Sequence, residues 1–543
     1  MEASALLSLW AKHAGPPSQG AGNAKKPRVQ HVAQVEISDE LKSGRGLVLA
    51  RTVKPGEVIL TIPPSMLYNT ATIRVFFQNA AEVLPTSRRP SDSISSPSSE
   101  LDAALPLTSV RALSILLASF AMYKASGEPE PSTWSTAQTE ALTDLNVFYA
   151  SLPTAFPTHP LIWTLLAEGD TQSARNYSAL LRHLPRSCRS KLEEVVLQFQ
   201  SDWTVVNAIF LHRPDLLPFF HPSPSGIACS KMAYAHAWLS INTRSVYYPL
   251  NLQPHSDNLT LAPLLDMANH TSDESSIFKV AILGIHHGAA KVPVILPPGA
   301  GGLEIRAPSG ADTQLLATGS EVRIQYGARD DGVLLAEYGF HLSNTAASSL
   351  SPATLIGNPY ASLSLDKYVA EYMSTLDPGE AKEKQDSLIE AGYYGDWTIH
   401  PYPTPIASWR TVVALRLLVL VKGNADTQQE QQEQQQQLQR WKLLVEGRIS
   451  SISQENDVAA RRLLLRLCEA AQVDLQRTKC SLQAELRSGS GSDSDGDSVI
   501  STGEQVEDGP AWRESLGLVT SLLECEMEVC RRVREVAGSG TPW

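Results

Sequence analysis

The chain has 543 residues, of which 43% are hydrophobic, so it is long enough to form two or more packed units. Its formal net charge of −12 argues against a dedicated nucleic-acid binder, because such proteins carry a basic surface. No apolar run reaches the length of a membrane-spanning helix, and apolar residues 5–10 lack the basic flank of a signal peptide. We therefore expect a protein that binds neither nucleic acid nor membrane directly.

The cysteines are spread thinly along the chain, and none forms a CxxC or Cys/His metal-binding spacing. The six are Cys188, Cys229, Cys468, Cys480, Cys525 and Cys530. This usage predicts reduced thiols in a cytoplasmic or nuclear protein. The adjacent pair His286 and His287 has no third ligand nearby in the sequence, so we expect no metal site.

The chain opens with residues 1–28, which predict a short amphipathic helix followed by a Gly/Pro/Ala-rich loop. Residues 29–37 alternate imperfectly between apolar and polar, which favours a strand. Residues 43–50 place two glycines around an arginine, a pattern typical of a tight turn that can approach a ligand closely. A second strand is expected over residues 58–62, ended by Pro63.

A helical insertion is expected over about residues 66–235. Within it, the Ser/Pro-rich segment 88–106 predicts a flexible surface segment, and residues 110–123 predict one helix. The Pro-punctuated aromatic stretch 148–163 is interpreted as a packing loop, and residues 231–241 as a further helix. Strand patterns return after the insertion at residues 246–248, 278–284, 303–307 and 320–327.

The sequence pattern predicts a strand-rich unit over residues 29–345 and an all-helical unit over residues 350–543. The strongly apolar run 406–422 contains two arginines and is interpreted as a core helix. The Gln-rich tract 428–437 is either a solvated helix or a disordered insert, and the acidic segment 488–510 has a composition typical of disorder. The predicted fold class is α+β, a β-rich unit with a large helical insertion followed by an all-α C-terminal domain.

Polar residues interrupt one apolar run in the middle of the chain. Asp266, Asn269 and His270 arrive together within residues 261–271. An unpaired buried polar group costs roughly 1–3 kcal/mol, so these groups need partners. The turn therefore either satisfies its own polar groups or binds a ligand with them.

Four separated segments resemble the motifs of SET-domain protein methyltransferases. In chain order they are Gly44-Arg45-Gly46-Leu47, Trp238 with Asn242-Thr243-Arg244, Asp266 to His270, and Tyr326-Gly327 followed by Glu337-Tyr338-Gly339-Phe340. More narrowly, the chain resembles the branch typified by the Rubisco large-subunit methyltransferase. That branch joins a SET domain carrying a helical insertion to a helical substrate-binding domain, which matches residues 29–345 and 350–543.

The resemblance implies S-adenosyl-L-methionine as the cofactor and assigns roles to individual residues. The implied cofactor-binding residues are Gly44, Arg45, Gly46, Arg244, Asn269, His270 and Phe340. Arg244 corresponds to the arginine that holds the cofactor carboxylate, for which a guanidinium fork is suited. Tyr326 and Tyr338 correspond to the tyrosines at the catalytic centre. Asp266 is expected to support the turn.

The implied function is transfer of a methyl group to a lysine of a histone or non-histone protein. Val246, two residues after Arg244, is apolar where the histidine-specific branch has an amide, and this favours lysine. No Cys-x-Cys cluster follows Phe340, so a zinc-bound tail is not expected. Two alternatives stay open: a protein-histidine methyltransferase, and an inactive SET-like scaffold that only binds a partner.

The expected partner is a protein substrate, such as a ribosomal protein, a translation factor or a histone. The C-terminal helices of residues 350–543 are expected to bind it, and the chain is expected to act as a monomer.

Overall fold

The computed structural model describes residues 2–15, 31–85, 104–127, 134–219, 229–282, 301–310, 314–342, 357–401, 406–420, 428–489 and 509–539. Most of the predicted flexible segment 88–106, most of the acidic segment 488–510, the latter part of the N-terminal loop and the pair His286–His287 lie outside these residues. The chain divides into two compact units. The first comprises Met1–Phe156 and Val196–Gly327, and the second Pro157–Val195 and Ala328–Trp543. The sequence-based boundaries at residues 28–29 and 345–350 stay a prediction.

The main sheet of the first unit has four strands in the order β1-β2-β9-β6. Its strands are β1 (Val35–Leu41), β2 (Gly44–Leu49), β9 (Glu321–Ile324) and β6 (Asn269–His270). β1 and β2 are antiparallel and form a hairpin whose turn is Lys42–Ser43. The expected turn over residues 43–50 is therefore wrong in part, because the two glycines lie in a strand. The expected strand at 29–37 begins only at Val35.

Two smaller sheets complete the strands of this unit. A three-stranded sheet has the order β3-β8-β7, and β4 pairs with β5. The strands are β3 (Val58–Ile62), β8 (Leu303–Arg306), β7 (Lys279–Ile282), β4 (Ser245–Tyr247) and β5 (Leu259–Leu261). These positions confirm the strands predicted over residues 58–62, 246–248, 278–284 and 303–307, and β9 confirms the one over 320–327.

The helices of the first unit lie mostly between β3 and β4 in the sequence. They are α1 (Glu2–Ala14), α2 (Ala80–Val83), α4 (Ser109–Ser126), α5 (Thr136–Ser151), the later part of α8 (Arg186–His212) and α9 (Lys231–Arg244). Helix α4 begins where the Thr108 side chain accepts a hydrogen bond from the Arg111 backbone N–H, and ends at Gly127 in a left-handed conformation. It packs against α9, whose last residue is Arg244.

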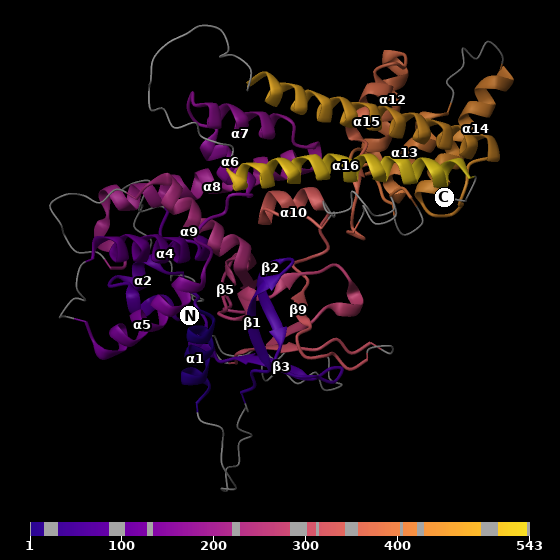
Figure 1. The fold of residues 1–543 in the computed structure, drawn as a ribbon. Coiled ribbons are helices and arrows are strands. Elements are labelled where there is room, and N and C mark those ends of the chain that lie inside the picture. Colours follow the sequence, from indigo (N-terminus) through magenta and orange to yellow (C-terminus); the bar gives the residue numbers. More distant parts are fainter. Residues whose placement is uncertain are drawn as a thin grey trace, which may run out of the picture. The chain divides into compact units, whose positions relative to one another are not determined.

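The second unit is helical apart from one short strand pair, β10 (Leu363–Ser364) with β11 (Thr398–Ile399). Its helices are α6 (Pro160–Leu166), α7 (Gln172–Arg182), the start of α8, α10 (Asp331–Tyr338), α11 (Asp366–Met373), α12 (Pro378–Glu390), α13 (Trp409–Leu418), α14 (Gln428–Val445), α15 (Gln454–Gly489) and α16 (Pro510–Gly538). Figure 1 shows α15 and α16 side by side, and they pack together extensively. The apolar face expected at Leu464, Leu467 and Leu475 is buried. The Gln-rich tract begins α14.

The mixed fold predicted from sequence is confirmed, with the correction that a two-stranded sheet interrupts the C-terminal helices. Within the described ranges, no helix combines the length and apolarity that crossing a membrane requires.

Candidate functional site

The two glycines of β2 are required for different reasons. Gly44 has a φ of +88°, a conformation that side chains with a Cβ rarely adopt. Gly46 leaves room for a neighbour, because a Cβ at this position would lie 2.5 Å from Asn269 Nδ2 and 2.7 Å from Leu41 Cδ1. The strand can therefore approach the Asn269 side chain only if residue 46 has no side chain.

Asn269 is held by three oxygen atoms around its amide nitrogen. Nδ2 lies 3.0 Å from Ser43 Oγ, 3.2 Å from the Arg45 carbonyl oxygen and 2.9 Å from Glu321 Oε1. An amide NH2 group has two hydrogens, so these acceptors occupy its donor capacity. The amide oxygen is consequently the end of the side chain that remains to face a ligand.

The parallel pairing of β6 with β9 brings Asn269 and Tyr326 together. Asn269 pairs with Arg323 and His270 with Ile324, so the chain reaches Tyr326 two residues beyond this pairing. The Tyr326 hydroxyl donates a hydrogen bond to the Ala268 carbonyl oxygen at 2.8 Å. Tyr326 is thereby tied to the residue that precedes Asn269.

The His270 side chain contacts both the backbone and the ring of Tyr326. Its Nδ1 accepts a hydrogen bond from the Tyr326 backbone N–H at 3.1 Å, and the two rings lie 5.1 Å apart. A backbone N–H can only donate, so Nδ1 carries no proton and the neutral ring has its proton on Nε2. The buried imidazole therefore positions the tyrosine, and it is absent from the pocket lining.

Arg244 and Asp266 form a second anchored pair. Arg244 Nη1 donates to the Asp266 backbone carbonyl at 2.7 Å and lies 3.6 Å from the Asp266 carboxylate. The Asp266 side chain is fully buried, and burial raises its pKa to about 6, a rise that the Arg244 guanidinium limits. Asp266 thus fixes the arginine, a contact that the sequence analysis did not predict.

The turn that carries Asp266 is built on a strained residue. Leu264, which is fully buried, has a φ of +73°, a conformation that costs about 1–3 kcal/mol in a residue with a side chain. It precedes a single 3-10 turn, Leu265–Met267. The surrounding packing holds this backbone and sets the direction of the Asp266 side chain.

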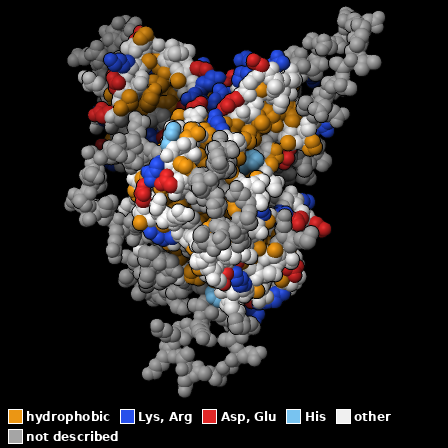
Figure 2. Space-filling model, turned by 90° about the vertical axis from the view of Figure 1, so that its left-hand side faces the viewer, with side chains coloured by type: hydrophobic (Ala, Val, Ile, Leu, Met, Phe, Trp, Pro, Cys, Tyr) orange, Lys and Arg blue, Asp and Glu red, His pale blue; other side chains and the backbone are white. Residues whose placement is uncertain are grey.

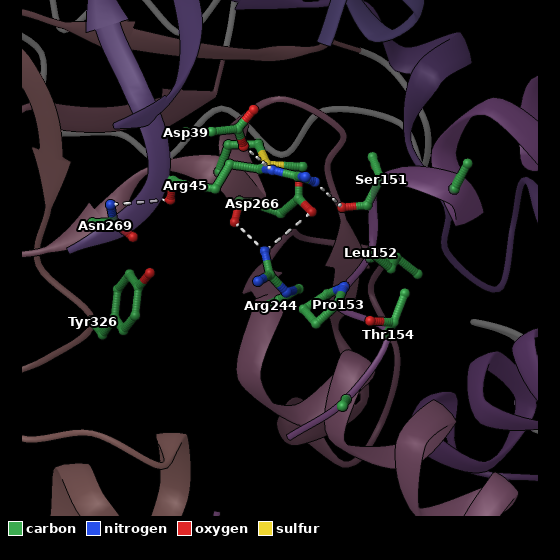
Figure 3. Close-up of a pocket in the computed structure, with 13 residues that line it drawn as sticks. Asp39, Arg45, Ser151, Leu152, Pro153, Thr154, Arg244, Asp266, Asn269 and Tyr326 are labelled. Carbon is green, nitrogen blue, oxygen red and sulfur yellow. Dashed lines mark hydrogen bonds and ion pairs between the residues drawn. The ribbon is translucent and has the colours of Figure 1, made fainter. Parts of the chain in front are cut away.

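These residues line one pocket of about 390 Å3, which lies wholly within the first unit. Four residues predicted from sequence contribute to it: Arg45, Arg244, Asn269 and Tyr326. Figure 3 shows Arg244 beneath Asp266 on one side of the pocket and Asn269 above Tyr326 on the other. Gly44, Gly46 and His270 shape the pocket without lining it.

Sequence reasoning missed one wall of the pocket. Residues 150–155, interpreted as a packing loop, line it beside Arg244. Arg45 connects the two walls, because its Nη1 lies 3.4 Å from the Ser151 carbonyl oxygen and its Nε 2.7 Å from Asp39. The prolines and aromatic residues of this segment gave no signal of a site, since it contributes mainly backbone and small side chains.

Tyr338 and Phe340 are placed in the second unit, and neither belongs to the pocket lining. Tyr338 ends α10, where burial raises its pKa, and its ring lies 6.2 Å from that of Phe340. Gly339 between them has a φ of +80° and packs against His159. The roles expected for Tyr338 and Phe340 stay predictions.

No group of side chains that could hold a metal ion occurs among the described residues.

Comparison with known proteins gives sequence relatives that match part of the chain. Ribosomal lysine N-methyltransferase set11 of Schizosaccharomyces pombe is 25% identical over 211 residues, which cover 39% of this chain and 43% of that protein. Ribosomal lysine N-methyltransferase 2 of Saccharomyces cerevisiae is 26% identical over 273 residues, covering 48% and 49%. SET domain-containing protein 4 of Homo sapiens is 28% identical over 242 residues, covering 44% and 46%. The chain thus spans about half the length of the curated relatives it matches.

Among solved structures, the SET domain of LSMT bound to lysine and AdoHcy aligns with 99% of this chain and 91% of its own. The identity is 15% and the TM-score 0.49, so this likeness carries no weight here. No family model matches the chain. The chain is thus similar in sequence to the ribosomal lysine N-methyltransferases of two yeasts and to SET domain-containing protein 4.

Proposed function

We propose that this protein is an S-adenosyl-L-methionine-dependent protein-lysine N-methyltransferase. The observation that supports this most is the pocket in which Arg45, Arg244, Asn269 and Tyr326 meet, although they are far apart in the sequence. The proposal also draws on relatives that are named as lysine methyltransferases.

The pocket residues fit the charged end of such a cofactor. Arg244 uses Nη1 on Asp266, while its buried Nε has no hydrogen-bond partner in the described chain, so the guanidinium keeps donors for a carboxylate. The Asn269 amide oxygen, with the nitrogen end already occupied, suits an ammonium group. The missing Cβ at Gly46 lets strand β2 approach the Asn269 side chain.

Bound S-adenosyl-L-methionine supplies a methyl group activated on a sulfonium sulfur. The contribution of the chain to such a transfer is mainly positioning. The Tyr326 hydroxyl uses its hydrogen on the Ala268 carbonyl, so its oxygen can accept a hydrogen bond from an incoming amine. Burial in the pocket lowers the pKa of a lysine amine and favours the neutral, nucleophilic form.

Lysine is proposed as the target rather than histidine. Val246 lies in β4, two residues after Arg244, and its side chain has no polar atom that could orient an imidazole ring. The alternative, histidine methylation, would need another group in that place.

We further propose that the helices of the second unit bind the protein substrate and that the chain acts as a monomer in the cytoplasm or nucleus. The six cysteines are all free thiols, which supports a reducing compartment.

Thermal unfolding with and without S-adenosyl-L-methionine tests the cofactor. A ligand at about 100 times its Kd stabilises the folded state by about 2.7 kcal/mol and raises Tm. We expect this shift in the wild type, its loss in Arg244→Gln, and its retention in Arg51→Gln. Arg51 is an exposed arginine of the same unit that pairs with Glu57 and is not in the pocket lining. No shift in the wild type would favour the scaffold alternative.

Methyl transfer tests the reaction itself. Purified protein is incubated with radiolabelled cofactor and fractionated cell extract, and the labelled protein is mapped by mass spectrometry. A methylated lysine is expected, with Arg244→Gln as the inactive control. A methylated histidine would contradict the choice of target, while a cofactor shift without any labelled protein would contradict the enzymatic proposal.

A further inference from the structure

The second unit contains a pocket of its own, here called the arginine pocket, with a volume of about 580 Å3. It is lined by the α7–α8 connection, the first turns of α8, β10, and parts of α11, α15 and α16. All of these segments belong to the second unit, so the pocket is separate from the one that holds Tyr326.

Four basic side chains line the arginine pocket: Arg182, Arg186, Arg189 and Lys367. Arg182 pairs with Glu485, and Lys367 lies 2.6 Å from Asp474. Arg189 donates only to the backbone carbonyls of Arg182 and Leu184. Neither Arg186 nor Arg189 forms an ion pair with any described residue, so no carboxylate in the described ranges neutralises their two charges.

The start of helix α8 adds partial positive charge at the same place. Pro185 accepts the first helical hydrogen bond, from the Arg189 N–H, and thus precedes the helix as its cap. Proline has no side-chain oxygen to accept from the first N–H groups, and the first turn contains no acidic residue. The positive end of the helix is therefore left uncompensated beside Arg186 and Arg189.

The most buried carboxyl group of the pocket does not offset these charges. Glu526 is 5% exposed and accepts a hydrogen bond from Ser187 Oγ at 2.7 Å. Burial raises its pKa to about 8, an effect that the Ser187 hydroxyl opposes and that Asp330 and Asp331 reinforce. At neutral pH this side chain is mainly protonated, and the pocket keeps an excess of positive charge within a chain of net charge −12.

Other parts of the lining suit a peptide better than a continuous polyanion. Leu184, Leu363, Leu475 and Leu523 supply apolar contacts, while the carboxylates of Glu193 and Asp474 would repel closely spaced phosphates. On the face shown in Figure 2, basic side chains gather in the upper part with acidic ones and apolar areas beside them. The mixture favours a ligand with alternating acidic and apolar groups.

We propose that the arginine pocket binds an acidic peptide segment of a partner protein, with the forked donors of Arg186 and Arg189 pairing with its carboxylate or phosphate groups. This site would capture a partner independently of methyl transfer. Its test therefore uses no methyl donor, and its failure leaves the proposed enzymatic function untouched.

Fluorescence polarisation with three labelled peptides of equal length tests the proposal on the full chain. The first alternates Asp and Glu with Leu, the second carries phosphoserine in the acidic positions, and the third carries Asn and Gln there. We expect the two acidic peptides to bind and the neutral one to bind at least about tenfold more weakly. Whichever of the two acidic peptides binds more tightly shows whether carboxylate or phosphate is the recognised group. Raising salt from about 50 mM to about 300 mM should weaken both.

Arg186→Ala and Arg189→Ala should each weaken the acidic peptides by about tenfold, and their combination by more. The matched control is Arg513→Ala, because Arg513 is an exposed arginine of α16 that does not line the pocket. Arg186 and Arg189 are both exposed, so the variants should fold, which an unchanged Tm checks.

Three results would overturn the proposal. They are equal binding of acidic and neutral peptides, unchanged binding in the double variant, and tighter, Arg186-dependent binding of a single-stranded RNA of matched charge. The last would assign the pocket to nucleic acid instead of a peptide.

Discussion

The pocket of the first unit and the arginine pocket of the second both combine guanidinium groups with a buried carboxyl group, but Arg244 of the first is anchored on an aspartate and Arg186 of the second is not. Arg244 is anchored on the backbone and carboxylate of Asp266, and the side chain is mostly buried. Arg186 is exposed and makes no ion pair with a described residue. A fixed donor suits a reaction that depends on positioning, whereas an exposed side chain can adapt to ligands of varied shape.

The buried carboxyl groups of the two pockets, Asp266 and Glu526, also differ in the charges that lie near them. Asp266 faces an arginine, which limits the rise of its pKa to about 6. Burial raises the pKa of Glu526 to about 8, a rise that the Ser187 hydroxyl opposes and the carboxyl groups of Asp330 and Asp331 reinforce. The comparison shows that burial alone does not decide ionisation, because the neighbouring charge determines which form the pocket contains at neutral pH.

The largest effect is expected for Glu526→Gln. A carboxyl group whose pKa is raised on folding stabilises the folded state at low pH, and this stability is lost as pH rises from about 4.5 through about 8. Glutamine mimics the protonated form and removes that loss, which amounts to as much as about 5 kcal/mol. Hydrogen exchange in peptides of α16, measured from about pH 5 to about pH 9, reports the local free energy of opening.

In that experiment the variant should be more stable than the wild type above about pH 8 and nearly equal to it at about pH 5. Identical pH profiles for the two proteins would show that Glu526 is ionised in the folded state.

A smaller effect in the same direction is expected for Asp266→Asn. Here the wild type loses up to about 3 kcal/mol between pH values of about 4 and about 6, and the variant should lack this slope. Asparagine also removes the charge opposite Arg244, so cofactor binding should weaken by about tenfold. A variant that binds the cofactor as well as the wild type does would show that Asp266 is not needed to orient Arg244.

Tyr326→Phe separates positioning of the substrate from binding of the cofactor. The phenylalanine ring keeps the packing on His270 but loses the hydroxyl, so we expect turnover to fall about 100-fold while the cofactor-induced shift in Tm remains. Tyr247→Phe is the matched control, since this exposed tyrosine of the same unit does not line the pocket. Loss of the thermal shift in Tyr326→Phe would reassign the residue to cofactor binding.

The smallest expected effects are those of two glycine substitutions, which should change stability in opposite directions. In Gly46→Ala the new methyl group would overlap Asn269 and Leu41, which should destabilise the first unit by about 2 kcal/mol and abolish the cofactor shift. In Gly517→Ala, within helix α16 and with open space around it, stability should rise by about 0.5–1 kcal/mol. Urea unfolding measures both, and equal effects would mean that the space at residue 46 is not restrictive.

Much of the fold followed from local pattern. The helix over Val110–Tyr123 and the strand over Val58–Ile62 were predicted because periodicity and a terminating glycine or proline act over a few residues. The hairpin of β1 and β2 was not predicted, because residues 43–50 were assigned to a turn. The positive φ of Gly44 is needed at the first residue of β2 after a two-residue turn.

Site residues could be predicted from the sequence where they belong to a motif. Residues that reach the pocket only through the tertiary fold could not. Arg244, Asn269 and Tyr326 lie in motifs that resemble those of a known family, and they were named from that resemblance. Residues 150–155 contribute through a backbone carbonyl and small side chains, which every sequence contains, so only tertiary structure places them in the pocket. The support that His270 gives to Tyr326 likewise depends on a parallel pairing between strands more than 50 residues apart.

The pairing of β6 with β9 positions two parts of the site together, so both are kept or lost at once. Neighbouring residues of a strand point to opposite sides, so Asn269 lines the pocket while His270 is buried behind Tyr326. A shift of one residue between β6 and β9 would exchange the two side chains and turn the imidazole into the pocket and the amide away from it. The register of β6 against β9 therefore determines both the position of Asn269 in the pocket and the contact of His270 with Tyr326. A change in this register would alter both at once.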